Sequence, residues 1–378
     1  ILFCMKKFPD HGGLQDTACQ AFHDMILSTC DKTRQLVALD CMEYVVTAMR
    51  KHLAIMSLQE KACIILGKII SSANSSINQK TMSVLNGIRP IIKCMNKYPN
   101  NAYLQEVAIS VIMDLVIGND DNKNSVEALG GIVAIVKAMQ THLDVLQIQE
   151  NGCRSLWILA ANNDVNKVSI ASANGINTII KAMDTHPMNI SLQKKACGAL
   201  WSLSYNSMTN QLSIAKYNGF TAILRAMRSH QQALDLQEQA LRALLNLTSK
   251  NKENQSHVVV GGGIEIIIST MLIHENISSV QEKACDVLWA IATTDIVREY
   301  IGNKLGISAL LKAMSRHHDV EGVQEKALWV LMNVIKNVHV CNTIAQMDIG
   351  SIILKAKKNF PQKCRKLANE ILLSLGYD

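Results

Sequence analysis

The sequence is poor in aromatic residues, in dense positive charge and in long apolar runs, and each shortage disfavours a class of function. Phe, Trp and Tyr make up 4% of the 378 residues, which weakens any case for stacking on single-stranded nucleic acid. The formal net charge of +7 favours acidic partners but falls short of a typical nucleic-acid binder. The longest apolar candidate, VVVGGGIEIII, contains Glu265 and three glycines, so it lacks the ~18 apolar residues of a membrane span. We therefore expect a soluble protein.

Signatures of enzymes and of metal or phosphate sites are also missing. The sequence has no CxxC, and nothing in it resembles a catalytic triad or a paired-carboxylate site. The stretch GNDDNKNS at 118–125 lacks the glycine and distal glutamate of a calcium loop. The GGG at 261–263 lacks the Lys-Ser/Thr that follows in a phosphate loop. We therefore expect no catalytic residue, metal site, cofactor or small-molecule substrate.

A phrase close to QEKA recurs along the whole chain. The glutamine of each copy, called the marker glutamine below, is Gln15, Gln59, Gln105, Gln149, Gln193, Gln237, Gln281 or Gln324. The steps between them are 44, 46, 44, 44, 44, 44 and 43 residues, and so regular a period is typical of a solenoid. A glycine lies 18 residues before six of these glutamines, and Cys41 takes that place in the first full repeat.

The pattern within one repeat predicts three helices. Around Gln193 they are expected at 166–174, 176–186 and 191–205. Asparagines 27 residues before the marker are expected to cap the first helix; they are Asn78, Asn122, Asn166, Asn210 and Asn254. The glycine, Gly175 in this repeat, is expected to form a turn that needs positive φ.

The stretches GGIVAIVKAMQTH, IQENGCRSLWILA and QEKALWVLMNVIKN resemble the armadillo family, and the resemblance covers essentially the whole chain. It implies an all-α, right-handed α-solenoid of three-helix repeats whose third helices line a concave groove. HEAT repeats are the structural alternative. We expect a single array over 1–378, with a truncated N-terminal repeat at 1–32, seven full repeats over 33–338 and a closing repeat at 339–378.

One face of the third helix is predicted to form the core. Counted from the marker glutamine, positions +3, +4, +7, +10 and +11 share that face, for example Ala196, Cys197 and Leu200. Five of the eleven cysteines occupy position +4: Cys19, Cys63, Cys153, Cys197 and Cys285. Neighbours in this row are about 10 Å apart, beyond the reach of a disulfide. We therefore expect free thiols in a reducing compartment, the cytoplasm or else the nucleus.

The opposite face, at +2, +5, +9 and +12, changes from repeat to repeat and is predicted to line the groove, with tryptophans at +8 on its border. The candidate binding residues are Arg154, Trp157, Lys195, Trp201, Ser202, Tyr205, Arg242, Asn246, Trp289, Trp329 and Asn333. Nuclear-import adaptors of the armadillo family hold basic peptides with paired tryptophan and asparagine, but only Trp329 with Asn333 reproduces both.

Basic residues gather at the centre of the predicted groove: Arg154, Lys194, Lys195, Arg242 and Lys250. This resembles the groove of catenin-type armadillo proteins, which hold extended acidic segments. The resemblance therefore implies a non-enzymatic scaffold that binds an extended or helical, acidic protein segment. Solvated surface charge without a partner is the alternative for these residues.

Two further rows of residues recur on the second helices. Histidine ends the second helix in six repeats, where packing at a helix terminus is expected rather than metal binding. A basic ridge comprises Lys93, Lys137, Lys181, Arg225, Lys312 and Lys355. The alternative function is that this ridge binds the phosphate backbone of a nucleic acid or an anionic membrane surface. A third alternative is that the array is one arm of a larger protein, because the chain begins with Ile1 rather than Met. The sequence does not determine the oligomeric state.

Overall fold

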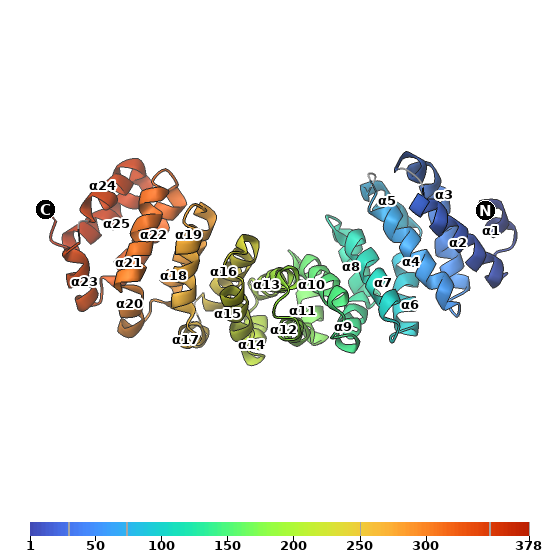
Figure 1. Ribbon diagram of the computed structural model, residues 1–378, viewed down its shortest axis with the longest axis horizontal. Coiled ribbons are helices and arrows are strands. Elements are labelled where there is room, and N and C mark those ends of the chain that lie inside the picture. The colour runs from blue at the N-terminus through green and yellow to red at the C-terminus, as the bar shows by residue number, and fades with distance from the viewer. Residues whose placement is uncertain (29–30, 73–74, 250, 348, 378) are drawn as a thin grey trace. The chain divides into compact units, whose positions relative to one another are not determined.

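The computed structural model describes residues 1–28, 31–72, 75–249, 251–347 and 349–377, and within these ranges it contains helices and no strand. The chain divides into two compact units, Ile1–His186 and Pro187–Asp378, coloured blue to green and green to red in Figure 1. The all-α repeat fold is confirmed. The division of the array into repeats stays a prediction, although the helices do follow one another in threes over most of the chain.

The helices of the two units have the following bounds. The first unit contains α1 (Leu2–Lys7), α2 (Gly12–Ser28), α3 (Asp31–Lys51), α4 (Met56–Ile70), α5 (Ser75–Val84), α6 (Ile88–Lys97), α7 (Ala102–Val116), α8 (Asp120–Ala128), α9 (Gly131–Thr141), α10 (Leu146–Ala160), α11 (Asp164–Ser172) and α12 (Gly175–Thr185). The second unit contains α13 (Ile190–Ser204), α14 (Met208–Lys216), α15 (Gly219–Ser229), α16 (Leu234–Thr248), α17 (Lys252–Val260), α18 (Gly263–Ile273), α19 (Ser278–Ile291), α20 (Asp295–Ile301), α21 (Lys304–Arg316), α22 (Glu321–Val334), α23 (Val338–Ala345), α24 (Gly350–Asn359) and α25 (Pro361–Ser374).

Third helices pack side by side within each unit. They are α2, α4, α7 and α10 in the first unit and α13, α16, α19, α22 and α25 in the second. The helices expected at 166–174, 176–186 and 191–205 are α11, α12 and α13, each beginning and ending one or two residues earlier. In the first full repeat, where Cys41 stands in place of the glycine, α3 runs unbroken from Asp31 to Lys51.

The predicted core positions are confirmed. Ala196, Cys197 and Leu200 are fully buried, and the equivalent residues of the other described repeats are also buried, Ala284, Cys285 and Leu288 among them. The described cysteines are free thiols. Spacing within the +4 row does not include contacts with the second helix, and there Cys63 has a cysteine neighbour. Its Sγ lies 4.0 Å from that of Cys94 on α6.

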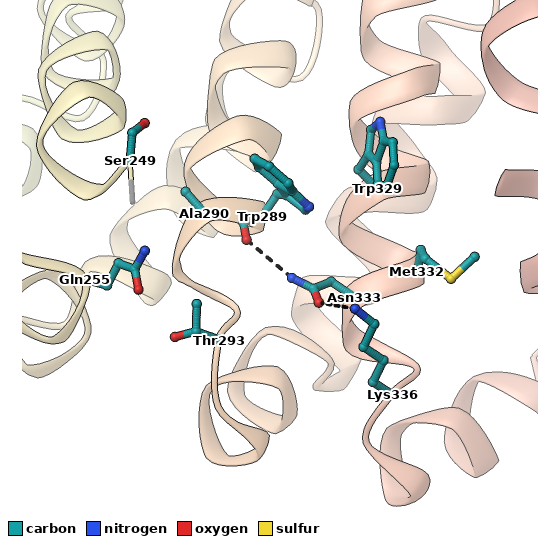
Figure 2. A pocket seen from close by; sticks show the side chains of 9 residues that line it. All are labelled: Ser249, Gln255, Trp289, Ala290, Thr293, Trp329, Met332, Asn333 and Lys336. Atoms are coloured by element: carbon teal, nitrogen blue, oxygen red, sulfur yellow. Dashed lines mark hydrogen bonds between the residues drawn. The ribbon is translucent and has the colours of Figure 1, made fainter. Parts of the chain in front are cut away.

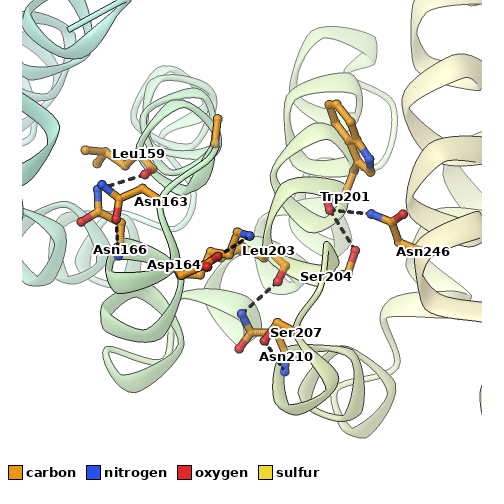
Figure 3. Close-up of polar contacts among 12 residues, drawn as sticks. Leu159, Asn163, Asp164, Asn166, Trp201, Leu203, Ser204, Ser207, Asn210 and Asn246 are labelled. Carbon is orange, nitrogen blue, oxygen red and sulfur yellow. Dashed lines mark hydrogen bonds and ion pairs between the residues drawn. The ribbon is translucent and has the colours of Figure 1, made fainter. Parts of the chain in front are cut away.

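The helix caps differ from the prediction. Asn163, three residues before the expected Asn166, caps α11 by accepting a hydrogen bond from the Asn166 amide, as drawn in Figure 3. Asn166 itself is buried and donates through Nδ2 to the Leu159 carbonyl at 2.9 Å. Equivalent bonds join Asn78 to Ile69, Asn122 to Leu115, Asn210 to Leu203 and Asn254 to Leu247. These asparagines therefore hold each first helix to the end of the preceding third helix.

The turn glycine also acts differently from the prediction. Positive φ occurs one residue earlier, at Asn174 (65°), which ends the preceding helix in the left-handed conformation. Gly175 begins α12, and a Cβ on it would lie 2.6 Å from Ile170 Cγ2 and 2.8 Å from the Ile170 carbonyl oxygen. Glycine is therefore required by close approach of the two helices and not by its own backbone angles.

The marker glutamine joins the second and third helices of each repeat. Gln149 is fully buried and donates through Nε2 to the carbonyls of Met139 and His142, at 2.9 and 2.8 Å. Gln15, Gln59, Gln105, Gln237, Gln281 and Gln324 make the same pair of bonds. Since the last carbonyls of a helix have no partner within it, this repeated residue satisfies them.

The histidine row links neighbouring repeats. His142 Nε2 lies 2.8 Å from the Pro99 carbonyl, and His274 Nε2 lies 2.7 Å from that of Gln231. A carbonyl only accepts, so these rings donate from Nε2. The expected role at the helix terminus is confirmed, because the histidines stand at the C-caps.

No single helix in the described part of the chain is long and apolar enough to cross a membrane. α17 and α18 together have the length and composition, but they are bent by 71°.

Candidate functional site

The predicted binding residues of the second unit lie on the third helices α13, α16, α19 and α22. Trp201, Arg242 and Asn246 are half-buried, whereas Trp289 and Trp329 are 47% and 40% exposed. Of the others on α13, Ser202 is buried, Lys195 is half-buried and Tyr205 follows the helix as its exposed C-cap. The structure thus brings six of the predicted residues of this unit together in two clusters: Trp201, Arg242 and Asn246 form one, and Trp289, Trp329 and Asn333 form the other.

The first cluster joins α13 and α16. The Arg242 guanidinium carbon lies 5.0 Å from the centre of the Trp201 ring, within the range of a cation–π contact. Asn246, one turn further along α16, donates through Nδ2 to the Trp201 carbonyl at 3.2 Å (Figure 3). The Arg242 Nε is buried without a hydrogen-bond partner, and no described carboxylate lies within ion-pair distance of this side chain. The Arg242 side chain is therefore held in place by Trp201, and its positive charge is not paired with a carboxylate among the described residues.

The second cluster lines a pocket of about 470 Å³ that is bordered by α16, α17, α19 and α22. Trp289 and Trp329 face each other with ring centres 6.2 Å apart and planes inclined by 57°. Asn333 donates to the Trp289 carbonyl at 3.4 Å and accepts from Lys336 Nζ at 3.2 Å, as Figure 2 shows. Met332 completes the apolar lining. The pocket thus combines two open aromatic rings with one amino group.

Most lysines at position +2 form ion pairs with carboxylates of the neighbouring repeat. The groove is therefore less basic than the sequence predicted. Lys326 pairs with Asp286 at 2.8 Å and Lys283 with Glu238 at 3.6 Å. Burial alone would lower the pKa of Lys326, but the hydrogen bond and charge of Asp286 raise it overall. Arg242 and Lys336, in contrast, have no carboxylate partner among the described residues.

Two more lysines were predicted at the basic centre of the groove, Lys194 and Lys250. Lys194 forms an ion pair with Asp235 at the start of α16. Lys250 lies outside the described residues. Sequence reasoning missed Lys336 and Met332, although their spacing of +12 and +8 from Gln324 would have placed both at the groove.

The first unit carries Arg154 and Trp157 on α10, exposed and half-buried respectively. Burial raises the pKa of Asp114 on α7, and the charge of Arg154 opposes that shift. Arg154 therefore has an acidic neighbour, which reduces the positive electrostatic potential around its side chain. Asp114 also lines a hollow of about 370 Å³ on α4, α7 and α10, together with Ser110, Glu106 and other polar residues.

The part of the chain that the structure describes contains no group of three or more His, Cys, Asp or Glu placed to hold a metal ion. The arrangement of both clusters is suited to binding through aromatic contact, hydrogen bonds and charge.

Several solved structures share the fold. An engineered protein of known crystal structure aligns with a TM-score of 0.73 and 17% identity, over 99% of this chain and 98% of its own. A second engineered protein aligns with a TM-score of 0.57 and 22% identity, over 66% and 96%. A structure described for a conserved phosphorylation switch in the interaction between cadherin and β-catenin aligns with a TM-score of 0.60 and 16% identity, over 95% and 82%. Identities this low show the fold alone.

The sequence comparisons are more specific. No sequence among the curated proteins matches the chain. The sequence model of a family described as the H subunit of the V-ATPase matches residues 56–282, more than half of the chain. The armadillo resemblance is thus supported at the level of fold, by the β-catenin structure, while the sequence itself points to a named family of helical-repeat proteins. The chain belongs to the V-ATPase H-subunit family.

Proposed function

We propose that the protein is a non-enzymatic scaffold that holds an extended or helical, acidic segment of a partner protein on the third helices. The observation that carries the proposal is Arg242, which is fixed over Trp201 and lacks a carboxylate partner among the described residues. A carboxylate of a partner would supply the missing charge. Charge-assisted hydrogen bonds of this kind contribute about 1.5–3 kcal/mol where they are shielded from water.

Two comparisons support a role in protein binding. The family is named for one component of a multi-protein assembly, and such a component works in contact with other proteins. The β-catenin structure concerns an interaction with cadherin. We further propose a reducing compartment, the cytoplasm or the nucleus, because the described cysteines are free and mostly buried.

The test is binding of a fluorescein-labelled peptide of alternating glutamate and serine, measured by fluorescence anisotropy on the full chain. We expect the double variant Arg154→Glu/Arg242→Glu to weaken binding at least tenfold. Its melting temperature should stay nearly unchanged, because neither side chain belongs to the core. The uncharged variant Arg242→Gln should show an intermediate loss.

The matched control reverses two exposed lysines of the ridge, Lys137→Glu/Lys181→Glu. It changes the net charge by the same amount on the second helices instead of the third. If this pair weakens binding and the arginine pair does not, the alternative function as a general binder of anionic surfaces replaces the scaffold.

A further inference from the structure

The pocket between α19 and α22 has a lining that indicates what kind of side chain it binds. We infer that it accepts an apolar side chain of the partner segment, with an acidic residue next to it that pairs with Lys336. The inference rests on the proposed scaffold function and adds the chemistry of the anchor residue.

The apolar part of the pocket comes from two tryptophans and a methionine. Trp289 and Trp329 remain 47% and 40% exposed although each ring contacts the other. Leaving so much aromatic surface in water is unfavourable, and covering it is worth roughly 25 cal/mol per Å². Buried aromatic anchors surrounded by polar groups dominate the energetics of protein interfaces. Met332 adds an adaptable wall that adjusts to the shape of an inserted side chain.

The charge of the pocket decides between an acidic and a basic neighbour. Tryptophan faces also attract cations, so a lysine or arginine of the partner would be the obvious rival occupant. However, Lys336 lies in the same pocket, and the described residues that line it include no carboxylate. A second cation would meet like charge without a counter-ion, whereas a carboxylate would gain a partner in Lys336.

Most of the other polar groups of the pocket are already engaged; the exceptions among the described residues are the buried Gln255 Oε1 and the two indole N–H groups. The Ser249 hydroxyl donates to the Leu245 carbonyl at 2.6 Å, and Gln255 Nε2 donates to the Thr248 carbonyl at 3.0 Å. The Asn333 amide is held between the Trp289 carbonyl and Lys336. Lys336, which has two further N–H groups, is therefore the charged donor left for a ligand, beside the neutral indole N–H groups of Trp289 and Trp329. This favours an apolar anchor with one anion over a polar small molecule.

The experiment uses four glycine- and serine-based peptides that carry phenylalanine flanked by aspartates, serine flanked by aspartates, phenylalanine flanked by asparagines, or phenylalanine flanked by lysines. Affinity for the full chain is measured by fluorescence anisotropy. Occupancy of the pocket is followed separately by ¹⁹F NMR after 5-fluorotryptophan labelling, since the chain has only four tryptophans. Trp289→Phe and Trp329→Phe assign the two pocket signals.

We expect the peptide with phenylalanine and aspartates to bind at least fivefold more tightly than each of the others and to shift the signals of Trp289 and Trp329. Trp329→Leu should remove the advantage of phenylalanine over serine. Lys336→Glu should reverse the preference between aspartate and lysine flanks. The matched control Lys312→Glu, at an exposed lysine of α21 in the same unit, should leave the preference unchanged.

The outcomes separate the two proposals. Equal binding of the phenylalanine and serine peptides with aspartate flanks would overturn the apolar anchor while leaving the acidic scaffold in place. Tighter binding of the lysine-flanked peptide would overturn both the anchor chemistry and the acidic partner. Absence of binding by all four peptides at millimolar concentration would overturn the scaffold proposal, and the anchor with it.

Discussion

Replacing Gln149 by methionine isolates the two hydrogen bonds that join the end of α9 to α10. The glutamine Nε2 lies 2.9 Å from the Met139 carbonyl and 2.8 Å from the His142 carbonyl, in a fully buried position. Methionine has a similar length and flexibility, so the packing cost of the exchange is below about 1.5 kcal/mol. The remaining loss of stability reports the hydrogen bonds.

The magnitude follows from the acceptors that are left behind. The His142 carbonyl keeps the Val145 amide as a donor at 3.1 Å. For the Met139 carbonyl, the described residues supply no second donor. One lost hydrogen bond costs about 0.5–1.5 kcal/mol, and a buried acceptor without a partner costs about 1–3 kcal/mol. Methionine also removes Gln149 Oε1, a buried oxygen without a partner, and this offsets part of the loss. We therefore expect Gln149→Met to lower the free energy of unfolding by about 1–3 kcal/mol.

The assay is urea unfolding followed by circular dichroism, with Gln147→Met as the matched control. Gln147 lies on the same helix but is exposed, and its side chain reaches only Asn151. The control should change the free energy of unfolding by no more than about 0.5 kcal/mol. If Gln149→Met were as mild as Gln147→Met, the hydrogen bonds of the marker glutamine would not be what stabilises the repeat.

Four further outcomes are expected. Gln149→Glu places a carboxyl against the same carbonyls, where burial raises its pKa above the unfolded value of about 4.3; stability should therefore fall as the pH rises through that value, as urea unfolding across pH would show. Gly175→Val should cost at least about 1 kcal/mol in thermal unfolding, because its Cβ would collide with Ile170. Burial raises the pKa of Cys197 to about 12, so this thiol should resist iodoacetamide at pH 8 until the protein unfolds, and mass spectrometry would detect early labelling. Asn163→Ala should lower the melting temperature through loss of about 1 kcal/mol of cap stabilisation.

Helices and core were predictable because they depend on periodicity. The apolar positions of the third helix repeat at 3.6-residue spacing, so the burial of Ala196, Cys197 and Leu200 followed from counting. The candidate site was predictable only as a face. Which groove cations are neutralised depends on the neighbouring repeat, as for Lys326 with Asp286, and no local pattern contains that information.

The misassigned helix caps have a physical cause. The asparagine represented by Asn166 is the same residue type in five successive repeats. The true cap is also asparagine in most repeats, at Asn119, Asn163 and Asn251, and is Ser207 or Thr294 in two others. Any short polar side chain satisfies a helix cap. A buried amide that must reach the carbonyl of the preceding helix has less freedom. Two asparagines three residues apart therefore both match a cap by residue type, and only the contacts of the buried one distinguish them.

The histidine links couple the turns of successive repeats. Within the second unit, His274 on one repeat donates to the Gln231 carbonyl in the turn of the repeat before it, and His317 donates in the same way to Glu275. Because the energy of a hydrogen bond is shared by donor and acceptor, opening of a turn destabilises the histidine that follows it in the chain, and loss of that histidine destabilises the turn by the same amount. Turns joined by a histidine should therefore open together, and hydrogen exchange would record similar protection of the amides in neighbouring turns.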